Sequence, residues 1–424
     1  MGRSRVGVWL IGARGAVATT VAVGALARAR GLVDDAGLVT ALPLFQTLGL
    51  PAVEDLVLGG CDIRSAPVLA TAERLAGQLS GVRRDLLPAL AAELAAHDRR
   101  LSPGITHNVG PAIARLVAGP GPGPADIRAA LAAVTADLRR FREEGRLDRL
   151  VVINLASTEP LLADDPSHHD PELFRVRLAA GDGQAMRAST LYAWAALEEG
   201  CAFINFTPSN GALLPALVEH ARQRRLPVMG NDGKTGETLV KSALAPLFAS
   251  RNLPVLSWEG TNLLGNLDGA VLDDPEHRAA KVRSKDQVLP RILGYAPHTG
   301  VHIHFVPSLD DQKTAWDLIH FQGFLGARMS LQFTWQGYDS ILAAPLVLDL
   351  ARLAAYALAR GEGGLLPHLA CFFKDPLGVA EQRLVPQFAL LEEYVRRQPP
   401  AADEPQHVQQ GIAKAEGTGR CRLG

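Results

Sequence analysis

The sequence predicts an α/β protein in which helices pack on a parallel sheet, followed by a second domain with a sheet of its own. Three observations predict it: an opening strand–turn–helix unit, an alternation of short apolar runs with helical segments as far as Ser250, and a change to longer β-rich segments near Val255. At 424 residues the chain is long for one hydrophobic core, so two closely connected domains are expected.

The first element is a short apolar run at Val6–Ile11, and the helix-forming segment Ala16–Arg28 follows it. Such a unit usually opens a nucleotide-binding sheet. Between them lies the turn Gly12-Ala13-Arg14-Gly15-Ala16-Val17-Ala18. Its amides are placed to hold a dinucleotide pyrophosphate at a helix N-terminus, and a purely structural turn is the alternative interpretation.

Helices and strands continue to alternate after the opening unit. Helices are predicted at Ala125–Glu144, Leu213–Arg225 and Thr238–Ser250, and strands at Leu150–Leu155, Cys201–Phe206 and Leu226–Met229. Glycine alternates with proline at Gly119–Pro124, which predicts a loop. Helical crossovers between strands are typical of a parallel sheet.

Beyond Val255 the pattern is more extended. Gly300–Val306 and Arg328–Thr334 are rich in aromatic and β-branched residues, so they are predicted as strands of a second sheet. A helical pattern resumes at Ala343–Gly361, and residues 398–424 are predicted to be a mobile tail.

Charge and cysteine content exclude several classes of protein. The formal net charge is -1, so neither nucleic acid nor an acidic membrane surface is an expected partner. The four cysteines, Cys61, Cys201, Cys371 and Cys421, contain no C-x-x-C pair, so neither a disulfide framework nor a zinc site is indicated. No signal peptide is indicated and no apolar run is expected to span a bilayer, so a cytoplasmic protein is predicted.

A glycine-rich segment at Gly230–Glu237 lies between a predicted strand and a predicted helix. Gly233-Lys234-Thr235 resembles the end of a P-loop, but the leading glycine of that motif is Val228 here, which argues against a nucleoside triphosphatase. The amides of Thr235, Gly236 and Glu237 are expected at a helix N-terminus, where they suit a sugar phosphate.

Two lysines, Lys281 and Lys285, are spaced i, i+4 and share one face of a predicted helix. Their mutual repulsion is expected to lower the pKa of at least one toward the catalytic range, and a solvated basic face is the alternative. Just upstream, Asn266 and Asp268 lie in the turn-rich segment Asn262–Gly269, a type of loop that commonly contacts ligands.

Two further lysines accompany apolar runs. Lys313 and Asp311 follow the strand Val301–Val306, and Lys374 directly follows Leu369–Phe373. Burying the charge of a lysine beside an apolar run costs free energy unless the lysine is paired with a carboxylate or takes part in function.

Histidines raise the question of a metal site. His302 and His304 point to the same side of a strand, and His168 and His169 lie among Asp164, Asp165 and Asp170. The strand pair lacks a third ligand nearby and the acidic loop is equally a hydrated turn, so we predict no metal ligands.

Taken in order, these motifs resemble the myo-inositol-1-phosphate synthase family from Gly7 to about Val379. The matching segments are Gly59-Gly60-Cys61-Asp62, Asn154–Glu159, Phe203–Asn210, Gly230–Ser242, Leu264–Gly269 and Asp339–Pro345. The resemblance implies an NAD-binding Rossmann-type domain, split into residues 1–238 and 343–397, around an inserted α+β catalytic and tetramerisation domain at residues 239–342. It also implies a homotetramer.

The resemblance also implies site residues. The catalytic set is Lys281, Lys285, Lys313, Lys374, Asp232, Asp268, Asp311 and Asp339. The NAD-binding set is Gly12, Ala13, Arg14, Gly15, Ala16, Val17, Asp62, Asp232, Asp339 and Ser340. The substrate-binding set is Thr235, Gly236, Glu237, Leu264, Asn266 and Lys285.

The reaction that the resemblance implies begins when NAD oxidises C5 of glucose 6-phosphate. Enolisation, an intramolecular aldol closure onto C1 and return of the hydride follow. As role hypotheses, Lys281 with Asp339 handles protons at C5, Lys313 and Lys374 stabilise the enolate and the C1 oxygen, and Lys285 with Thr235, Gly236 and Asn266 binds phosphate. Cations in a dry pocket suit these successive negative charges.

Alternatives remain because Arg14, Ala18, His302 and His304 depart from the family pattern. The same chemistry on another hexose phosphate, for instance a ketose phosphate, would make a different cyclitol phosphate, since contacts that read hydroxyls are few and easily changed. A non-catalytic NAD-sensing protein would lack the lysines, and a plain dehydrogenase would release NADH.

Overall fold

The strand β1 (Val6–Ile11) lies buried near the centre of a parallel sheet, as its unbroken apolar run predicts. The computed structural model describes residues 4–77, 81–117, 126–286 and 288–399, with side chains described throughout except at residues 280 and 282–286. The predicted loop at Gly119–Pro124 and all but the first two residues of the predicted tail lie outside these ranges.

Within the described residues the first sheet has seven strands, in the order β11-β6-β5-β4-β1-β2-β3, and all of them pair in parallel. The other strands are β2 (Leu56–Asp62), β3 (Leu101–Pro103), β4 (Arg149–Asn154), β5 (Ala202–Asn205), β6 (Pro227–Met229) and β11 (Gly364–Leu365). The order of β1 to β6 is that of the Rossmann fold, in which the strand order reverses between β1 and β4 and leaves a crevice at the carboxyl ends. The predicted fold class is confirmed.

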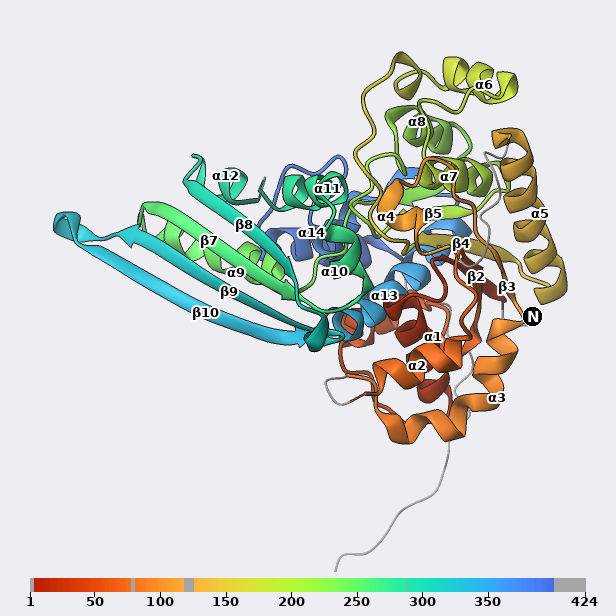
Figure 1. Cartoon of the computed structure of the whole chain (residues 1–424), viewed down its shortest axis with the longest axis horizontal. Coiled ribbons are helices and arrows are strands. Elements are labelled where there is room, and N and C mark those ends of the chain that lie inside the picture. Colours follow the sequence, from red (N-terminus) through yellow and green to blue (C-terminus); the bar gives the residue numbers. More distant parts are fainter. Residues whose placement is uncertain (1–3, 78–80, 118–125, 287, 400–424) are drawn as a thin grey trace, which may run out of the picture.

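Helices cover both faces of this sheet (Figure 1). The helices of the first part are α1 (Ala16–Ala29), α2 (Val68–Leu75), α3 (Leu87–Asp98), α4 (Pro111–Ala114), α5 (Ile127–Gly145), α6 (Pro171–Ala180), α7 (Ala188–Glu198) and α8 (Pro215–Gln223). Those that follow are α9 (Gly236–Ser250), α10 (Leu267–Leu272), α11 (Pro275–Asp286), α12 (Val288–Leu293), α13 (Asp339–Ala359) and α14 (Leu384–Arg397).

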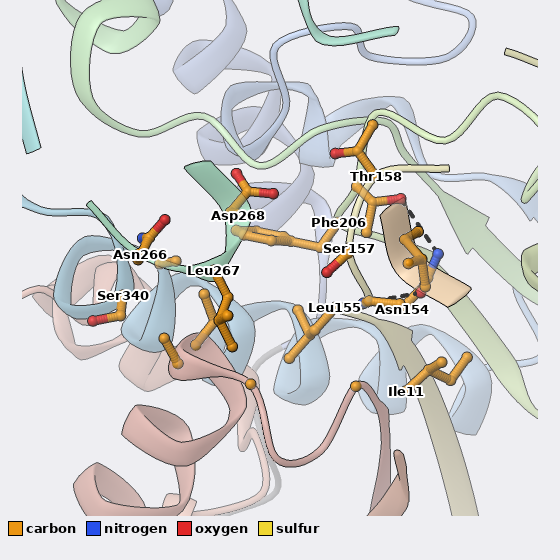
Figure 2. Close-up of a pocket in the computed structure, with 18 of the residues that line it drawn as sticks. Ile11, Asn154, Leu155, Ser157, Thr158, Phe206, Asn266, Leu267, Asp268 and Ser340 are labelled. Atoms are coloured by element: carbon orange, nitrogen blue, oxygen red, sulfur yellow. Dashed lines mark hydrogen bonds between the residues drawn. The ribbon is translucent and has the colours of Figure 1, made fainter. Parts of the chain in front are cut away.

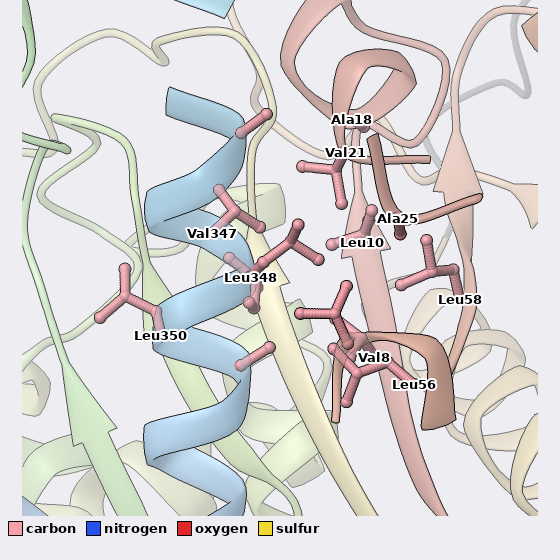
Figure 3. Close-up of a cluster of buried hydrophobic side chains, with 14 of the residues drawn as sticks. Val8, Leu10, Ala18, Val21, Ala25, Leu56, Leu58, Val347, Leu348 and Leu350 are labelled. Carbon is pink, nitrogen blue, oxygen red and sulfur yellow. The ribbon is translucent and has the colours of Figure 1, made fainter. Parts of the chain in front are cut away.

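The side chains of β1 alternate between two cores. Trp9 and Ile11 pack with residues of α5, α7 and α8, whereas Val8 and Leu10 face α1 and α13. Figure 3 shows Leu10 in the same cluster as Val21 of α1 and Leu348 of α13. The chain therefore returns to the first sheet after an excursion of about a hundred residues, and α13 completes the core that α1 begins.

The excursion forms a second, mixed sheet in the order β10-β9-β7-β8, which extends away from the first (Figure 1). Its strands are β7 (Val255–Leu264), β8 (His298–Phe305), β9 (Gln312–Gln322) and β10 (Arg328–Tyr338). One face packs on α9 and α12 through Phe248, Trp258 and Leu289. The expectation of another sheet from Val255 onward is confirmed.

The helix α13 corrects one expectation. Its 21 residues have a window of mean hydropathy 1.7, so by length and composition it is apolar enough to cross a membrane. In this structure 61% of that window is buried inside the protein, where it packs on α1. The charged residues Asp349 and Arg352 interrupt its apolar sequence.

The predicted domain borders at residues 238/239 and 342/343 fall within α9 and α13. Each of these helices begins beside the cavity described below and then runs into a hydrophobic core. The borders remain a prediction.

Candidate functional site

A cavity of about 340 Å³ opens at the carboxyl edge of the first sheet, in the crevice between β1 and β4. Figure 2 shows Asn266, Leu267 and Ser340 on one side of it and Ile11, Asn154 and Leu155 on the other. The cavity therefore joins the ends of the parallel strands to α10 and to the start of α13.

The glycine turn after β1 lets the backbone bend tightly beside this cavity. Gly12 has φ +83°, and a Cβ there would lie 3.0 Å from Cα of Ala156. Gly15 precedes α1, and a Cβ there would lie 3.0 Å from the carbonyl oxygen of Gly12. Gly12, Gly15, Ala16 and Val17 line the cavity at the N-terminus of a 14-residue helix, a favourable place for phosphate.

The other two residues of the turn face elsewhere. Ala13 is fully buried, and the guanidinium of Arg14 pairs with Asp98 at 2.5 Å. Neither lines the cavity. Ala13 and Arg14 were predicted to bind the cofactor, and although their side chains do not line the cavity, that contact remains a prediction.

An acid stands at the end of β2, where Rossmann proteins hold the adenosine ribose. Asp62 follows Arg14 by 48 residues, whereas the customary spacing is about 20. Short 3-10 segments between Val39 and Asp55 fill the interval, which is why spacing alone did not indicate Asp62. Its carboxylate accepts hydrogen bonds from the amide of Arg14 (2.7 Å) and from the side chain of Arg64 (2.9 and 3.0 Å).

Three lysine–aspartate pairs lie around the other end of the cavity. The Nζ–Oδ distances are 2.9 Å for Lys374–Asp232, 3.1 Å for Lys313–Asp339 and 2.9 Å for Lys281–Asp268. Asp311 is also close by, because it accepts hydrogen bonds from Ser340 (2.5 Å) and Asn266 (3.3 Å). The structure thus brings together the lysines and aspartates that the sequence singled out, with the exception of Lys285.

Lys285 lies on α11, and its side chain is outside the described residues. Its predicted contact with phosphate remains a prediction.

Lys374 reaches Asp232 because the two segments run side by side. Gly233 and Phe373 form an antiparallel bridge, and the amide of Lys374 donates to the carbonyl of Asp232 at 2.7 Å. A Cβ on Gly233 would lie 2.0 Å from the Phe206 ring, so glycine is required there. The predicted anion-binding loop is therefore supported by a segment far away in the sequence.

The N-terminus of α9 meets the Lys313–Asp339 pair. Gly236 has φ +54°, and a Cβ there would lie 3.4 Å from both Nζ of Lys313 and Oδ1 of Asp339. The hydroxyl of Thr235 donates to Asp339 at 3.5 Å. The predicted anion-binding residues Thr235 and Gly236 thus adjoin the charged cluster.

Two predicted substrate contacts turn away from the cavity. Glu237 is 1% exposed and pairs with Lys241 at 2.5 Å, and Leu264 packs in a small core with Leu272 and Ile303. Neither lines the cavity, so their side chains do not form its wall.

Burial and neighbouring charges shift the pKa values in opposite directions. Burial lowers the pKa of Lys374, Asp232 opposes this effect, and the charges of Lys281 and Lys313 lower it further. Burial alone would raise the pKa of Asp339, but the three lysines outweigh it and lower that pKa to about 2. A lysine that releases its proton more readily thus lies near a carboxylate that stays ionised.

The expectation of a lowered pKa within the Lys281/Lys285 pair is wrong for Lys281. Burial would lower the pKa of Lys281, but the carboxylates of Asp268, Asp232 and Asp339 raise it overall. The helix geometry alone did not reveal these carboxylates, which come from other elements.

The histidines have other partners. His302 and His298 both contact Glu259, at 3.3 and 2.9 Å, on an accessible face of the second sheet. His168 is buried against the carbonyl of Ala185, and His169 pairs with Asp164. Among the described residues we find no group of three or more potential ligands with geometry suited to a metal ion.

Several polar residues of the cavity wall were not predicted as site residues, although some lie in the segments that match the family. Asn154 ends β4 and donates to Asn205 at 3.1 Å, and burial raises the pKa of Glu159 to about 7 despite its hydrogen bonds from Ser189. The available signal was a cluster of polar residues directly after each apolar strand. Arg64 carried the same signal, because it follows Asp62 directly after the apolar strand β2.

The sheet order, the glycine turn and the paired lysines define a Rossmann-type enzyme with a charged site at the strand ends. A sequence profile described as myo-inositol-1-phosphate synthase matches residues 6–396. The chain belongs to this family of NAD-dependent, isomerase-type enzymes, and the predicted family is confirmed.

Individual relatives agree with this assignment. Inositol-3-phosphate synthase 1 of Bacteroides thetaiotaomicron is 33% identical over 398 residues, which cover 88% of this chain and 90% of that protein. The human protein of the same name is 33% identical over 322 residues, which cover 74% of this chain and 56% of the human one.

Solved structures show the same fold. Inositol-3-phosphate synthase from Caenorhabditis elegans has a TM-score of 0.83 at 24% identity and covers 97% of this chain and 90% of its own. A myo-inositol-1-phosphate synthase-related protein from Thermotoga maritima has a TM-score of 0.74 at 23% identity and covers 94% and 100%.

Proposed function

We propose that the protein cyclises glucose 6-phosphate to a myo-inositol phosphate with the help of bound NAD. The observation that supports this most is that three lysine–aspartate pairs border the same cavity as the dinucleotide turn. The name shared by the relatives, inositol-3-phosphate synthase, supports the substrate class.

The residues present fit a dinucleotide. Gly12 and Gly15 leave the backbone open to close approach, and the first amides of α1 face a place for pyrophosphate. Asp62 and Ser340 complete the proposed NAD-binding wall, together with Asp232 and Asp339. When bound, NAD supplies a hydride acceptor for the sugar and returns the hydride at the end.

The lysines are proposed to manage the charges of the cyclisation. Lys281 and Asp339 handle protons at C5, and Lys313 with Lys374 stabilises the enolate and the C1 oxygen. The lowered pKa of Lys374 supports its part, because proton exchange is most effective when the pKa lies nearer the working pH. Lys285, Thr235, Gly236 and Asn266 are proposed to hold the phosphate.

The test is to incubate the purified protein with a trace of NAD and a panel of hexose phosphates, and then to identify the phosphate product. We expect an inositol phosphate from glucose 6-phosphate without stoichiometric NADH. NADH formed in proportion to substrate would indicate a dehydrogenase instead. Turnover of a ketose phosphate with glucose 6-phosphate inert would indicate a related cyclitol phosphate synthase.

We further propose that the protein is a homotetramer assembled through the second sheet. Phe324 and Leu325, in the connection between β9 and β10, are 89% and 90% exposed, and Trp316 and Met329 are also exposed. Apolar side chains of this size on an extended sheet favour association. Replacement of Phe324 and Leu325 by serine should reduce the mass measured by light scattering, and an unchanged tetramer would argue against this surface.

A further inference from the structure

Arg64 lines the cavity two residues after the end of β2, where Rossmann proteins bind the adenosine ribose of a dinucleotide. In Rossmann proteins an acid at the end of β2 binds the ribose 2'-hydroxyl, whereas a nearby arginine accommodates a 2'-phosphate. This chain has both, because Asp62 ends β2 and Arg64 follows two residues later, and both line the cavity.

The carboxylate of Asp62 is already occupied by protein donors. Oδ1 accepts from the amide of Arg64 (2.8 Å) and its Nε (3.0 Å), and Oδ2 accepts from the amide of Arg14 (2.7 Å) and Nη2 of Arg64 (2.9 Å). An ionised carboxylate offers about four lone-pair sites. Asp62 therefore has little capacity left for a ribose hydroxyl, and Arg64 neutralises its charge.

Arg64 in contrast keeps free donors at the turn. Its side chain is 21% exposed, and Nη2 lies 3.4 Å from the position of a Cβ on Gly15. Nη1 makes no hydrogen bond to any residue in the described ranges. The guanidinium donors that Asp62 leaves free therefore lie beside the turn, and they suit a phosphate oxygen better than a second carboxylate would.

We propose that Arg64 makes the dinucleotide site accept a 2'-phosphate, so that the protein binds NADP as well as NAD. This inference rests on the proposed function, since it concerns the cofactor of that same site. Arg64 is then the residue that determines cofactor specificity, and Asp62 holds its guanidinium in place.

The test is calorimetric titration of the full chain with NAD and, separately, with NADP. We expect dissociation constants within about tenfold of each other for the wild type. Arg64→Ala should weaken NADP binding by about 10- to 100-fold and change NAD binding much less, because a charge-assisted contact is lost and Asp62 is released. Arg64→Lys keeps the charge, so its dissociation constant for NADP should lie between those of the wild type and of Arg64→Ala.

Arg83→Ala is the matched control, because Arg83 pairs with Asp85 through the same two nitrogens at the surface, outside the cavity. It should leave the ratio of the two dissociation constants unchanged. Tight NAD binding without NADP binding, or an equal loss of both in Arg64→Ala, would overturn this inference and leave the proposed function intact. Failure of the wild type to bind either dinucleotide would overturn both.

Discussion

Two clusters of lysine and carboxylate lie on either side of the start of α9, and they differ in what surrounds them. In the first, Lys241 contacts Glu237 at 2.5 Å and Asp317 at 3.8 Å, between α9 and the second sheet. In the second, Lys374, Lys313 and Lys281 contact their aspartates beside the cavity. The lysine side chains are 2% exposed in the first cluster and 7 to 15% exposed in the second.

The comparison of the two clusters shows that a buried ion pair does not by itself indicate a functional site. The Lys241 cluster is enclosed by protein donors, since Asn262 donates to Glu237 and Trp258 donates to Asp317. The second cluster borders a cavity, and Asp268 and Asp339 remain 37% and 26% exposed. We therefore propose a structural role for the first cluster and a chemical role for the second.

The largest effect is expected from Lys374→Met in the cavity cluster. Turnover should fall by about 10²- to 10⁴-fold, because the variant cannot exchange a proton or stabilise an oxyanion. The measurement is the rate of inositol phosphate formation, with calorimetry showing that NAD still binds. Turnover within tenfold of the wild type would remove Lys374 from the proposed mechanism.

The matched change in the enclosed cluster is Lys241→Met. It should lower the free energy of unfolding by about 3–5 kcal/mol, because Glu237 and Asp317 stay buried without their cation. Urea denaturation measures this loss, and the turnover of the folded fraction should stay near that of the wild type. An unchanged unfolding midpoint together with lost turnover would reverse the assignments of the two clusters.

The dependence of stability on acid pH tests the Lys313–Asp339 pair of the cavity cluster. The pKa of Asp339 falls from 3.8 to about 2 on folding. A lowered carboxyl pKa stabilises the fold above the unfolded value, and this stabilisation is lost as the pH falls from 3.8 through about 2. Asp339→Asn should therefore be less stable by roughly 2 kcal/mol at neutral pH, and the difference should vanish near pH 2. A difference independent of pH would show that the pair with Lys313 is not responsible.

The smallest effect is expected at Gly236, which separates the two clusters. Gly236→Ala places a side chain at φ +54° and close to Lys313 and Asp339, so it should cost about 1 kcal/mol of stability. Because the added methyl lies beside the cavity cluster, the Michaelis constant for sugar phosphate should rise clearly, whereas the unfolding midpoint should fall only slightly. Ala249→Gly makes the reverse exchange in the last turn of α9. It is a control for the effect of backbone freedom on stability, without a change beside the cavity.

Much of the fold followed from local patterns. Val6–Ile11 matches β1 residue for residue, because a buried parallel strand is a continuous apolar run that ends at a glycine turn. The helix predicted at Thr238–Ser250 is α9 with two further residues at its start, where Gly236 has an unusual conformation that composition does not reveal.

The contacts within the candidate site were harder to predict from the sequence, because they join segments that are far apart in the chain. Lys374 meets Asp232 across 142 residues, and the bridge between Gly233 and Phe373 that aligns them has no local signature. The direction of Glu237, toward Lys241 and away from the cavity, likewise depends on how α9 packs on the second sheet.

By itself the sequence determined the α/β class and the glycine turn, because each depends on residue type and short-range periodicity, whereas the set of lysines and aspartates came from the resemblance to a known family. The tertiary structure decided which lysine pairs with which aspartate, which carboxylates are enclosed and which face the cavity, and that Arg64 covers Asp62. These outcomes depend on desolvation and on charges only a few ångströms apart, and such distances exist only after remote segments have packed together.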